Sequence, residues 1–213
     1  MKITKFGQCC LLIEVAGKRI LTDPGRFSTS QNNVTDIDLI LITHEHADHL
    51  HSESLLAVLA KNPGAEVITN TSVGKVLTEL EVSFKVLEGR ESGTHADILI
   101  EAFDGEHVEI IDEYGIVQNT GYFIAEKLFY PGDAYTNPKK EVPVLALPVA
   151  GPWCKASDAI HYAKEVNPIQ AFPVHDAVLS EAGIALTHGL FGGQLDAAGI
   201  NFIALKNDET ANF

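Results

Sequence analysis

A group of metal-binding residue types directly after an aliphatic segment restricts the fold of this chain more than any other feature of its sequence. Residues 37–42, Ile-Asp-Leu-Ile-Leu-Ile, are nearly all aliphatic, as is typical of a strand buried on both faces. After one threonine come residues 44–49, His-Glu-His-Ala-Asp-His. The fold must therefore bring the end of a buried strand to a site that can hold cations.

The spacing within this group predicts two neighbouring ions. In a His-x-His segment both imidazoles can turn to the same side of an extended chain and share one cation, which fits His44 and His46. Asp48 and His49 follow where the chain turns, so they can reach a second ion. Two metal ions that lie roughly 3.5 to 4 Å apart can stabilise both the attacking and the leaving oxygen in ester and amide hydrolysis. A merely solvated loop is disfavoured, because three histidines and an aspartate fall within six residues.

Length and charge narrow the class of protein. A chain of 213 residues with 46% hydrophobic and 21% charged residues predicts one globular domain spanning 1–213. Its 15 Lys and Arg against 29 Asp and Glu give a net charge of −14. Nonspecific nucleic-acid binding depends on clustered cations, so we expect no nucleic-acid partner.

The apolar patterns predict a β-rich chain with interspersed helices, arranged as stacked sheets flanked by helices. Helices are expected from Ser52 to about Lys61, from Thr71 or Ser72 to about Leu80, and from Ser157 to about Val166. Strands are expected at 3–6, 9–15, 19–22, 37–42, 67–69, 84–87, 98–103, 107–111, 120–124, 128–130, 144–147 and 170–174.

The cysteines and the N-terminal segment favour the cytoplasm. The apolar stretch after the basic start is interrupted by Glu14 and then by Lys18, which fits neither a signal peptide nor a membrane span. Three cysteines form a poor disulfide framework, which favours a reducing compartment. Cys9 and Cys10 lie in a strand-like segment and are predicted to be small core residues rather than thiolate ligands of a metal.

Together these motifs resemble the metallo-β-lactamase superfamily, in which His-x-His-x-Asp-His follows a strand and a distant His, Asp and His come later. His107 follows a Gly-containing turn, Asp133 follows Tyr-Pro-Gly, and His175 follows Pro-Val at the end of a late strand. Asp23 matches the first aspartate of the family, which supports the site without binding metal. The resemblance implies an α+β fold, the αβ/βα four-layer sandwich.

The resemblance also implies a ligand set and a mechanism. It places two divalent ions, Zn²⁺ or Mn²⁺, in one centre, with Asp48 and Asp133 as the acidic residues of catalysis. A hydroxide between the ions would attack an ester, lactone, phosphodiester or related bond of a small molecule with an electron-rich or anionic group. The first ion takes His44, His46 and His107, the second takes Asp48, His49 and His175, and Asp133 bridges them.

Within the superfamily, the chain resembles small single-domain metal-dependent hydrolases similar to ascorbate-6-phosphate lactonase. The turn at 147–151, Asn-Pro at 167–168 and Pro-Val-His at 173–175 follow the order of that group. Asp176 departs from it, because those relatives tend to carry Tyr there, and the pair Trp153-Cys154 is also unfamiliar. We expect a small-molecule substrate and no membrane association, and a homo-oligomer stays open.

Several alternatives remain open at this point. His188 competes with His175 as the last ligand, or lines the pocket, whereas His51, His95 and His161 are expected to be solvated or supporting residues. A non-haem iron oxidoreductase on the same fold is a rival, but di-iron relatives usually carry Glu where this chain has His46. A non-catalytic protein stabilised by metal is the second rival, although structural zinc sites are rarely paired.

Overall fold

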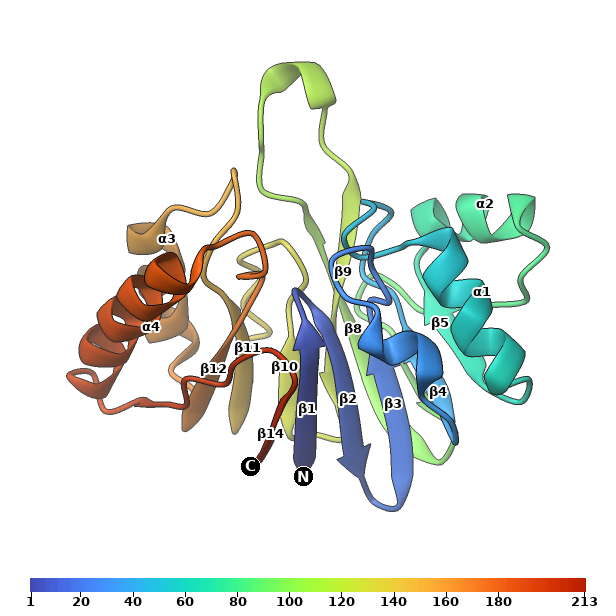
Figure 1. Cartoon of the computed structure of the whole chain (residues 1–213), viewed down its shortest axis with the longest axis horizontal. Coiled ribbons are helices and arrows are strands. Elements are labelled where there is room, and N and C mark those ends of the chain that lie inside the picture. Colours follow the sequence, from blue (N-terminus) through green and yellow to red (C-terminus); the bar gives the residue numbers. More distant parts are fainter.

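Two seven-stranded sheets face each other, and a pair of helices covers the outer face of each sheet (Figure 1). The computed structural model describes all residues from 1 to 213. The first sheet has the spatial order β14 (Glu209–Asn212), β1 (Lys2–Gly7), β2 (Cys10–Val15), β3 (Lys18–Thr22), β4 (Leu39–Leu41), β5 (Glu66–Thr69) and β6 (Lys85–Val86). Its strands from β3 to β6 are parallel, and the others are antiparallel.

The second sheet has the same mixed character. Its spatial order is β13 (Asn201–Phe202), β12 (Gln170–Val174), β11 (Val144–Pro148), β10 (Leu128–Tyr130), β9 (Gln118–Ile124), β8 (Ile98–Glu106) and β7 (Ser92–His95). The strands from β10 to β13 are parallel, whereas β7 to β10 form an antiparallel meander. Each sheet therefore combines a parallel half with an antiparallel half.

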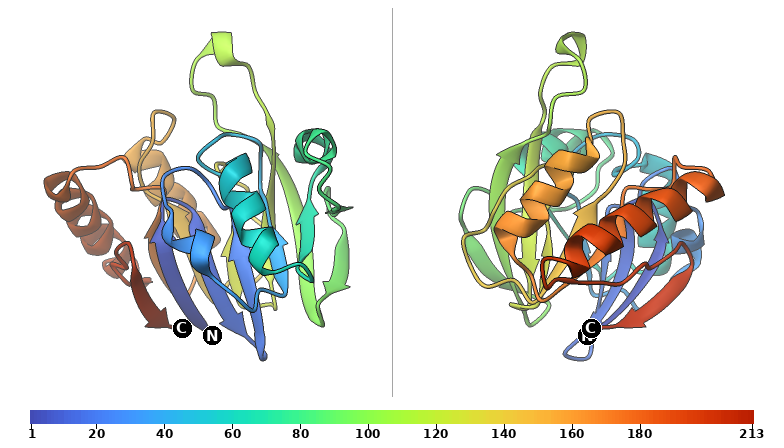
Figure 2. Two further views of the ribbon diagram at one scale, coloured as in Figure 1. Left: turned by 45° about the vertical axis from the view of Figure 1, so that its right-hand side comes forward. Right: turned by 90° about the vertical axis from the view of Figure 1, so that its left-hand side faces the viewer.

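The helices close the outer layers (Figure 2). Leu55 of α1 (Ser52–Lys61) and Val73 of α2 (Thr71–Glu79) share a buried cluster with residues of β2, β3 and β4. Ile160 of α3 (Ala156–Val166) and Phe191 of α4 (Glu181–Asp196) do so with β10, β11 and β12. The predicted four-layer sandwich of the α+β class is confirmed. None of the four helices combines the length and the apolar character that a bilayer-spanning segment needs.

The core between the sheets follows the strand period of two residues. Cys9, Leu11 and Ile13 belong to a buried cluster of 22 residues that both sheets share. Their neighbours Cys10 and Leu12 belong to the cluster under α1 and α2. This alternation is what the pleat of a strand imposes, and it separates two adjacent cysteines onto opposite faces of one sheet.

The expected strand at 107–111 is wrong. The pairing of β8 with β9 ends at Glu106 and Gln118, so the chain between them has no neighbouring strand. Residues 107–117 instead form a segment that projects from the end of the sandwich and carries a short 3-10 helix, Asp112–Tyr114 (Figures 1 and 2). We refer to residues 107–117 as the projecting segment. The apolar stretch at 107–111 therefore belongs to this projecting segment and pairs with no strand.

The carboxyl ends of several strands meet at the end of the sandwich from which the projecting segment rises (Figure 1). β3 runs parallel to β4 in the first sheet, and β8, β10 and β12 share one direction in the second. The side chains that follow these strands are Asp23, His44, His107, Asp133 and His175. Residues far apart in sequence are thereby brought to one place.

Candidate metal centre

Two groups of ligand atoms lie at this end of the sandwich. One group contains His44, His46 and His107, and the other contains Cys9, His49, Asp133 and His175. Within each group the ligand atoms all lie within 4.8 Å of one another. Only His46 among them is not fully buried, so the two groups form a largely enclosed site.

Asp133 stands between the two groups. Its Oδ2 lies 3.3 Å from His107 Nε2 and 3.9 Å from His44 Nε2 in the first group. On the other side, its Oδ2 lies 2.9 Å from His175 Nε2, and its Oδ1 lies 3.2 Å from His49 Nε2. This is the position that a carboxylate shared by two cations occupies.

The hydrogen bonding of the buried polar atoms shows whether the site suits cations. Buried polar atoms are normally satisfied by hydrogen bonds, yet no partner satisfies the Nε2 atoms of His44, His49, His107 and His175 or the Oδ1 atom of Asp133. Two atoms bound to one tetrahedral zinc ion at about 2.1 Å lie about 3.4 Å apart, close to the spacings around Asp133. A pair of divalent ions fits these unpartnered atoms.

Asp48 lies on the more open side of the site. Its Oδ2 is 3.2 Å from His175 Nε2 and 3.8 Å from His49 Nε2. Gln8 holds this carboxylate, because Gln8 Nε2 donates a hydrogen bond of 2.9 Å to Asp48 Oδ2. The Gln8 carbonyl oxygen also accepts a hydrogen bond of 3.0 Å from the His175 N–H. One residue between β1 and β2 thus links two of the predicted ligands.

Asp23 orients the histidines from behind. Its Oδ2 lies 2.7 Å from His49 Nδ1, which directs Nε2 of that ring toward the site. Asp23 also accepts hydrogen bonds from the Thr43 N–H at 2.8 Å and from the Thr43 hydroxyl at 2.7 Å. The Tyr130 hydroxyl lies 2.5 Å from Asp23 Oδ2. Such partners fix the tautomer and the direction of a metal-binding imidazole.

Two glycines allow the loops to approach closely. A Cβ atom on Gly25 would lie 1.8 Å from the carbonyl oxygen of Asp48, so only glycine fits where the Asp-Pro-Gly turn meets the histidine loop. Gly132 has a φ of +65°, and a Cβ there would lie 2.2 Å from Asn119 Oδ1. That oxygen accepts a hydrogen bond from the Asp133 N–H, which sets the position of Asp133.

Burial and charge shift the pKa values in opposite directions across the site. Burial, together with the nearby His49, lowers the pKa of His44 well below its usual value. Burial also opposes the charged forms of His49 and His175, but Asp133 raises the pKa of both rings well above the usual range. Burial alone would raise the pKa of Asp133, yet His175 and His49 hold it well below its usual value. In the metal-free protein, protons on two histidines therefore balance Asp133.

This charge balance predicts that zinc affinity rises with pH across the neutral range. Zinc must displace the protons of His49 and His175, whose raised pKa values keep both rings protonated at neutral pH. Affinity should fall about tenfold per pH unit for each displaced proton below these pKa values and level off above them. Competition with a chromophoric chelator between about pH 6 and 9 measures this. A flat profile would contradict the prediction.

His188 lies outside both ligand groups. Its Nε2 is 2.9 Å from Asp176 Oδ2, and the other oxygen of Asp176 accepts a hydrogen bond of 2.6 Å from Lys5 Nζ. All three side chains are buried, so they form a buried hydrogen-bonded cluster centred on Asp176, the residue after His175. His188 thus reaches the site only through the residue that follows His175.

The other three histidines are also bonded or exposed away from the ligand groups. His51 lies 2.8 Å from Glu53, at the start of α1. His95 Nδ1 lies 2.8 Å from Glu66 Oε1, and His161 is exposed on α3. The nine histidines thus divide into five at the site and four elsewhere.

Sequence reasoning missed several residues of this site. Cys9 was expected to be a core residue, and it does lie in the core cluster, yet it also belongs to the second ligand group. Gln8, Thr43 and Asn119 hold ligands through hydrogen bonds that no motif indicates, and Tyr130 holds Asp23 in the same way. The only signal was position, because each stands within two residues of a strand terminus at the end of the sandwich that carries the site.

A cavity of about 230 Å³ leads to the ligands. Its walls include five of the predicted ligands and, at the mouth, apolar residues. The lining residues are Phe27, His46, Asp48, His107, Ile110, Asp133, Pro152, Trp153, His175 and Val178. Trp153 stands over the site, with its ring centre 5.3 Å from that of His175 and 5.6 Å from that of His107. No lysine or arginine lines this cavity.

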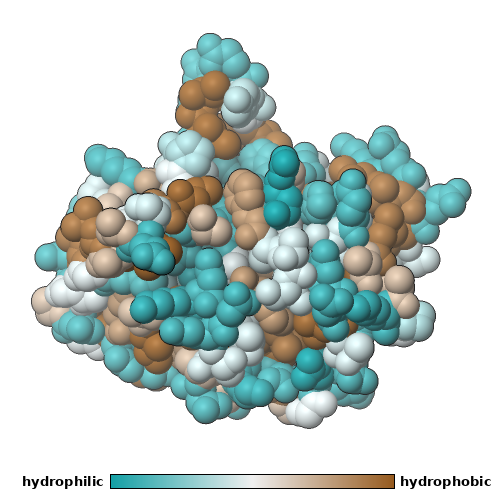
Figure 3. Space-filling view, in the orientation of Figure 1, coloured by the Kyte–Doolittle hydropathy of each residue, from teal (hydrophilic) through white to brown (hydrophobic).

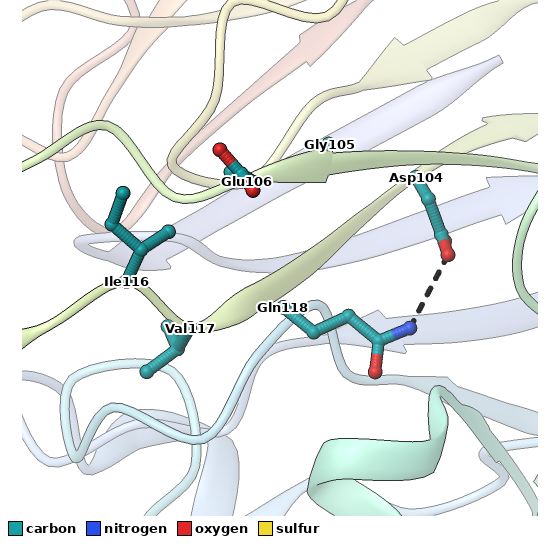
Figure 4. Close-up of a pocket in the computed structure, with 6 residues that line it drawn as sticks. All are labelled: Asp104, Gly105, Glu106, Ile116, Val117 and Gln118. Atoms are coloured by element: carbon teal, nitrogen blue, oxygen red, sulfur yellow. Dashed lines mark hydrogen bonds between the residues drawn. The ribbon is translucent and has the colours of Figure 1, made fainter.

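A second hollow lies at the base of the projecting segment (Figure 4). It is lined by Asp104, Gly105, Glu106, Ile116, Val117 and Gln118. Gln118 donates a hydrogen bond of 3.2 Å to Asp104 across it. None of the grouped ligand residues lines this hollow, so the site chemistry belongs to the smaller cavity.

Known proteins share both the sequence and the fold. A family model described as the beta-lactamase superfamily domain matches residues 2–175. The chain belongs to this superfamily. Protein Rv0786c of Mycobacterium tuberculosis is 34% identical to it over 194 residues, which cover 89% of this chain and 90% of that protein. A UPF0173 metal-dependent hydrolase of Ligilactobacillus salivarius is 30% identical over 183 residues, or 76% of this chain and 78% of that protein.

A solved structure of a metallo hydrolase extends the comparison to the whole fold. Igni18 of the archaeon Ignicoccus hospitalis aligns with a TM-score of 0.76 and 20% identity, covering 100% of this chain and 97% of that one. The predicted metallo-β-lactamase fold is confirmed. As the prediction of a metal-dependent hydrolase would require, the relatives of this chain include proteins named metal-dependent hydrolases. The match to the superfamily domain ends at His175, so α4 and the last two strands lie beyond it.

Proposed function

We propose that this member of the β-lactamase superfamily hydrolyses an ester or lactone of a small molecule at a centre of two divalent ions. The observation that carries the proposal is the convergence of buried, unpartnered ligand atoms from both sheets on Asp133. His44, His46 and His107 would hold one ion, and Asp48, His49 and His175 the other. Asp133 would contact both. When bound, the ions supply Lewis-acid activation of water and polarise the bond to be cleaved.

The residues of the chain orient the metal ligands, limit access of water to the centre and partly neutralise the charge of the ions. Asp23 and the Val108 carbonyl oxygen direct the rings of His49 and His107 by bonds to Nδ1. Trp153 covers one side of the site and limits access of bulk water. Two divalent ions with the carboxylates of Asp48 and Asp133 leave about two positive charges, which attract a carbonyl oxygen.

The cavity mouth supports a substrate with an uncharged, apolar substituent. Phe27, Ile110, Pro152, Trp153 and Val178 supply its apolar walls. Phosphate-binding sites usually recruit Arg or Lys to match the negative oxygens, and this cavity has neither. An ester or lactone therefore fits the walls better than a phosphodiester, whose negative charge only the ions would neutralise. The same lack of cations argues against a nucleic-acid substrate.

A matched pair of surface variants tests this choice of substrate. Val178 is 53% exposed on the cavity rim, and Leu186 is 75% exposed on α4, outside the cavity. Val178→Lys should lower kcat/KM for an apolar ester or lactone about tenfold, because it places a hydrated charge where about 1 to 2 kcal/mol of apolar contact forms. Leu186→Lys should leave it unchanged. The readout is hydrolysis of a panel of neutral lactones, aryl esters and phosphodiesters of similar size.

Two results would contradict the substrate assignment. One is preferential cleavage of phosphodiesters by the unaltered protein. The other is equal activity of the two lysine variants on apolar esters. Absence of bound metal from the purified protein would contradict the two-ion centre itself.

Zinc or manganese and a cytoplasmic location complete the proposal. Imidazole and carboxylate ligands suit both ions. The three cysteines are free, and two of them are buried, which supports a reducing compartment. Metal analysis of protein purified without added metal measures the first point, and fractionation of cells measures the second.

A further inference from the structure

The turn between β1 and β2 brings a thiol to the second ligand group. β1 is parallel in direction to β3, so its carboxyl end points to the same end of the sandwich as Asp23. The two-residue turn at this end is formed by Gln8, with a φ of +50°, and Cys9. The Cys9 side chain is fully buried on the face that looks toward the second sheet.

The backbone of Cys9 is held by the strands that carry the site. The Cys9 carbonyl oxygen accepts a hydrogen bond of 2.8 Å from the Thr22 hydroxyl, at the end of β3. The Tyr130 hydroxyl, at the end of β10, lies 2.9 Å from the same oxygen. Thr22 directly precedes Asp23, and Tyr130 stands three residues before Asp133. The position of Cys9 is therefore tied to that of the centre.

The surroundings of the thiol are ligand atoms that lack partners. The ligand atoms of Cys9, His49, Asp133 and His175 all lie within 4.8 Å of one another. His49 and His175 each have an Nε2 atom, and Asp133 has an Oδ1 atom, that is buried and without a hydrogen-bond partner. These three residues are at most 3% exposed. A thiol in apolar packing would face carbon atoms, whereas Cys9 faces three groups that need a cation.

We propose that Cys9 is a thiolate ligand of the second metal ion, together with His49, His175 and Asp133, and that it makes this position selective for zinc over manganese. This inference rests on the two-ion centre proposed above. Sulfur, two imidazoles and a carboxylate form a four-coordinate set that zinc accepts. On binding, the Cys9 S–H bond breaks, a sulfur–metal bond forms and the proton passes to solvent.

The thiolate changes what Asp48 does. Asp48 is 21% exposed in its side chain and already receives a hydrogen bond from Gln8, so it is the most open of the predicted ligands of this ion. With Cys9 in place of Asp48 as the fourth ligand of this ion, Asp48 would instead border the side that faces the cavity, where the substrate enters. Because thiolate is a soft ligand, it favours zinc, whereas manganese prefers oxygen ligands.

Cobalt spectroscopy tests the sulfur ligand directly. Metal-free protein is titrated with Co²⁺, bound cobalt is counted by elemental analysis, and the near-ultraviolet thiolate-to-cobalt charge-transfer band is recorded. The unaltered protein should show this band. Cys9→Ala should lose it and still bind cobalt at His44, His46 and His107. Cys10→Ala is the matched control and should keep the band, because Cys10 is equally buried but faces the helices.

The outcomes separate this inference from the proposed function. Two bound cobalt ions without the charge-transfer band would overturn the assignment of Cys9 and leave the two-ion centre standing. Failure to bind cobalt at all would overturn both. Loss of the band in Cys10→Ala but not in Cys9→Ala would also refute the assignment.

A second measurement does not depend on the folding of any variant. X-ray absorption at the zinc edge of the unaltered protein should show one sulfur neighbour per two zinc ions, at about 2.3 Å. A shell of nitrogen and oxygen alone would overturn the inference. In competition titrations, Cys9→Ala should weaken binding of the second zinc about 10- to 100-fold and binding of manganese much less. Equal losses for the two metals would refute the selectivity.

Discussion

Replacing Asp133 by asparagine should reduce bound zinc from two ions per chain to one or fewer and lower hydrolysis on the order of 1,000-fold. The Asp133 carboxylate lies within 3.3 Å of three histidine nitrogens, and it is 1% exposed. Asparagine has nearly the same shape but no charge. The variant would therefore lose a charge shared by both ions and leave buried histidines without their anion. Elemental analysis and kcat/KM on the preferred ester measure the two effects.

The matched control for this substitution is Asp158→Asn. Asp158 is exposed in the first turn of α3 and lies 3.9 Å from Lys155, so its charge is solvated. Exposed pairs of this kind contribute about 0 to 1 kcal/mol. Zinc content and hydrolysis should stay at the level of the unaltered protein. If Asp133→Asn kept two zinc ions and full activity, the proposed centre would be refuted.

Replacing Asp23 by asparagine should weaken zinc binding about 10- to 100-fold without removing any ligand. Asp23 lies fully buried between His49 Nδ1, Thr43 and the Tyr130 hydroxyl, all of which donate hydrogen to it. The asparagine side chain has an NH₂ group in place of one carboxylate oxygen. Its N–H donors would face some of the groups that donate hydrogen bonds to Asp23. The His49 ring would then lose its fixed direction, and the free energy of unfolding should fall by about 1 to 3 kcal/mol. Zinc competition titrations and urea unfolding measure these changes.

Asp38→Asn serves as the control at the opposite end of the same sheet. Asp38 accepts a hydrogen bond of 2.8 Å from the Arg19 N–H and lies before β4, away from the histidine loop. Its replacement should leave zinc affinity unchanged. An equal loss of zinc affinity in Asp38→Asn and Asp23→Asn would show that the effect of Asp23 is not specific to the site.

Local patterns were sufficient to predict most of the strands and the first half of the site. The run at 37–42 and the histidines at 44–49 lie next to each other in sequence, so their spacing alone indicates a cation site. His107, Asp133 and His175 carry no such local signal. They became candidates only through the resemblance to a family, because strand direction and sheet order decide which distant residues meet.

Helix α4 and the strands β7, β13 and β14 were not predicted; α4 and the wrongly expected strand at 107–111 have a physical explanation. The helix α4 contains four glycines and has apolar residues on all sides, with Leu186 75% exposed, so it lacks the periodic stripe that marks a surface helix. The apolar residues at 107–111 have the composition of a strand but no neighbouring strand to pair with. Isoleucines 111 and 116 of the projecting segment are exposed, and apolar surface gathers there in Figure 3.

Cys9 was not predicted as a ligand because it is a core residue as well as a neighbour of the ligand atoms. Its alternation with Cys10 and Leu11 is that of an ordinary strand, and it does pack in the core between the sheets. Only the arrangement of β1, β2 and β3 in one sheet, facing β10 and β12 of the other sheet, shows that its thiol faces ligands from both sheets. A sequence pattern describes which face a residue occupies and not what stands across from it.

The predicted ligands are divided between the two sheets, and this division bears on the lifetime of the protein in the cell. His44, His46 and His49 follow a strand of the first sheet, whereas His107, Asp133 and His175 follow strands of the second. The ions of the proposed centre would cross-link the two halves of the chain at their rim. Because ligands that bind only the folded state stabilise it, metal supply would then also affect how long each newly made molecule survives proteolysis. A cell starved of the ion would lose the protein as well as its activity.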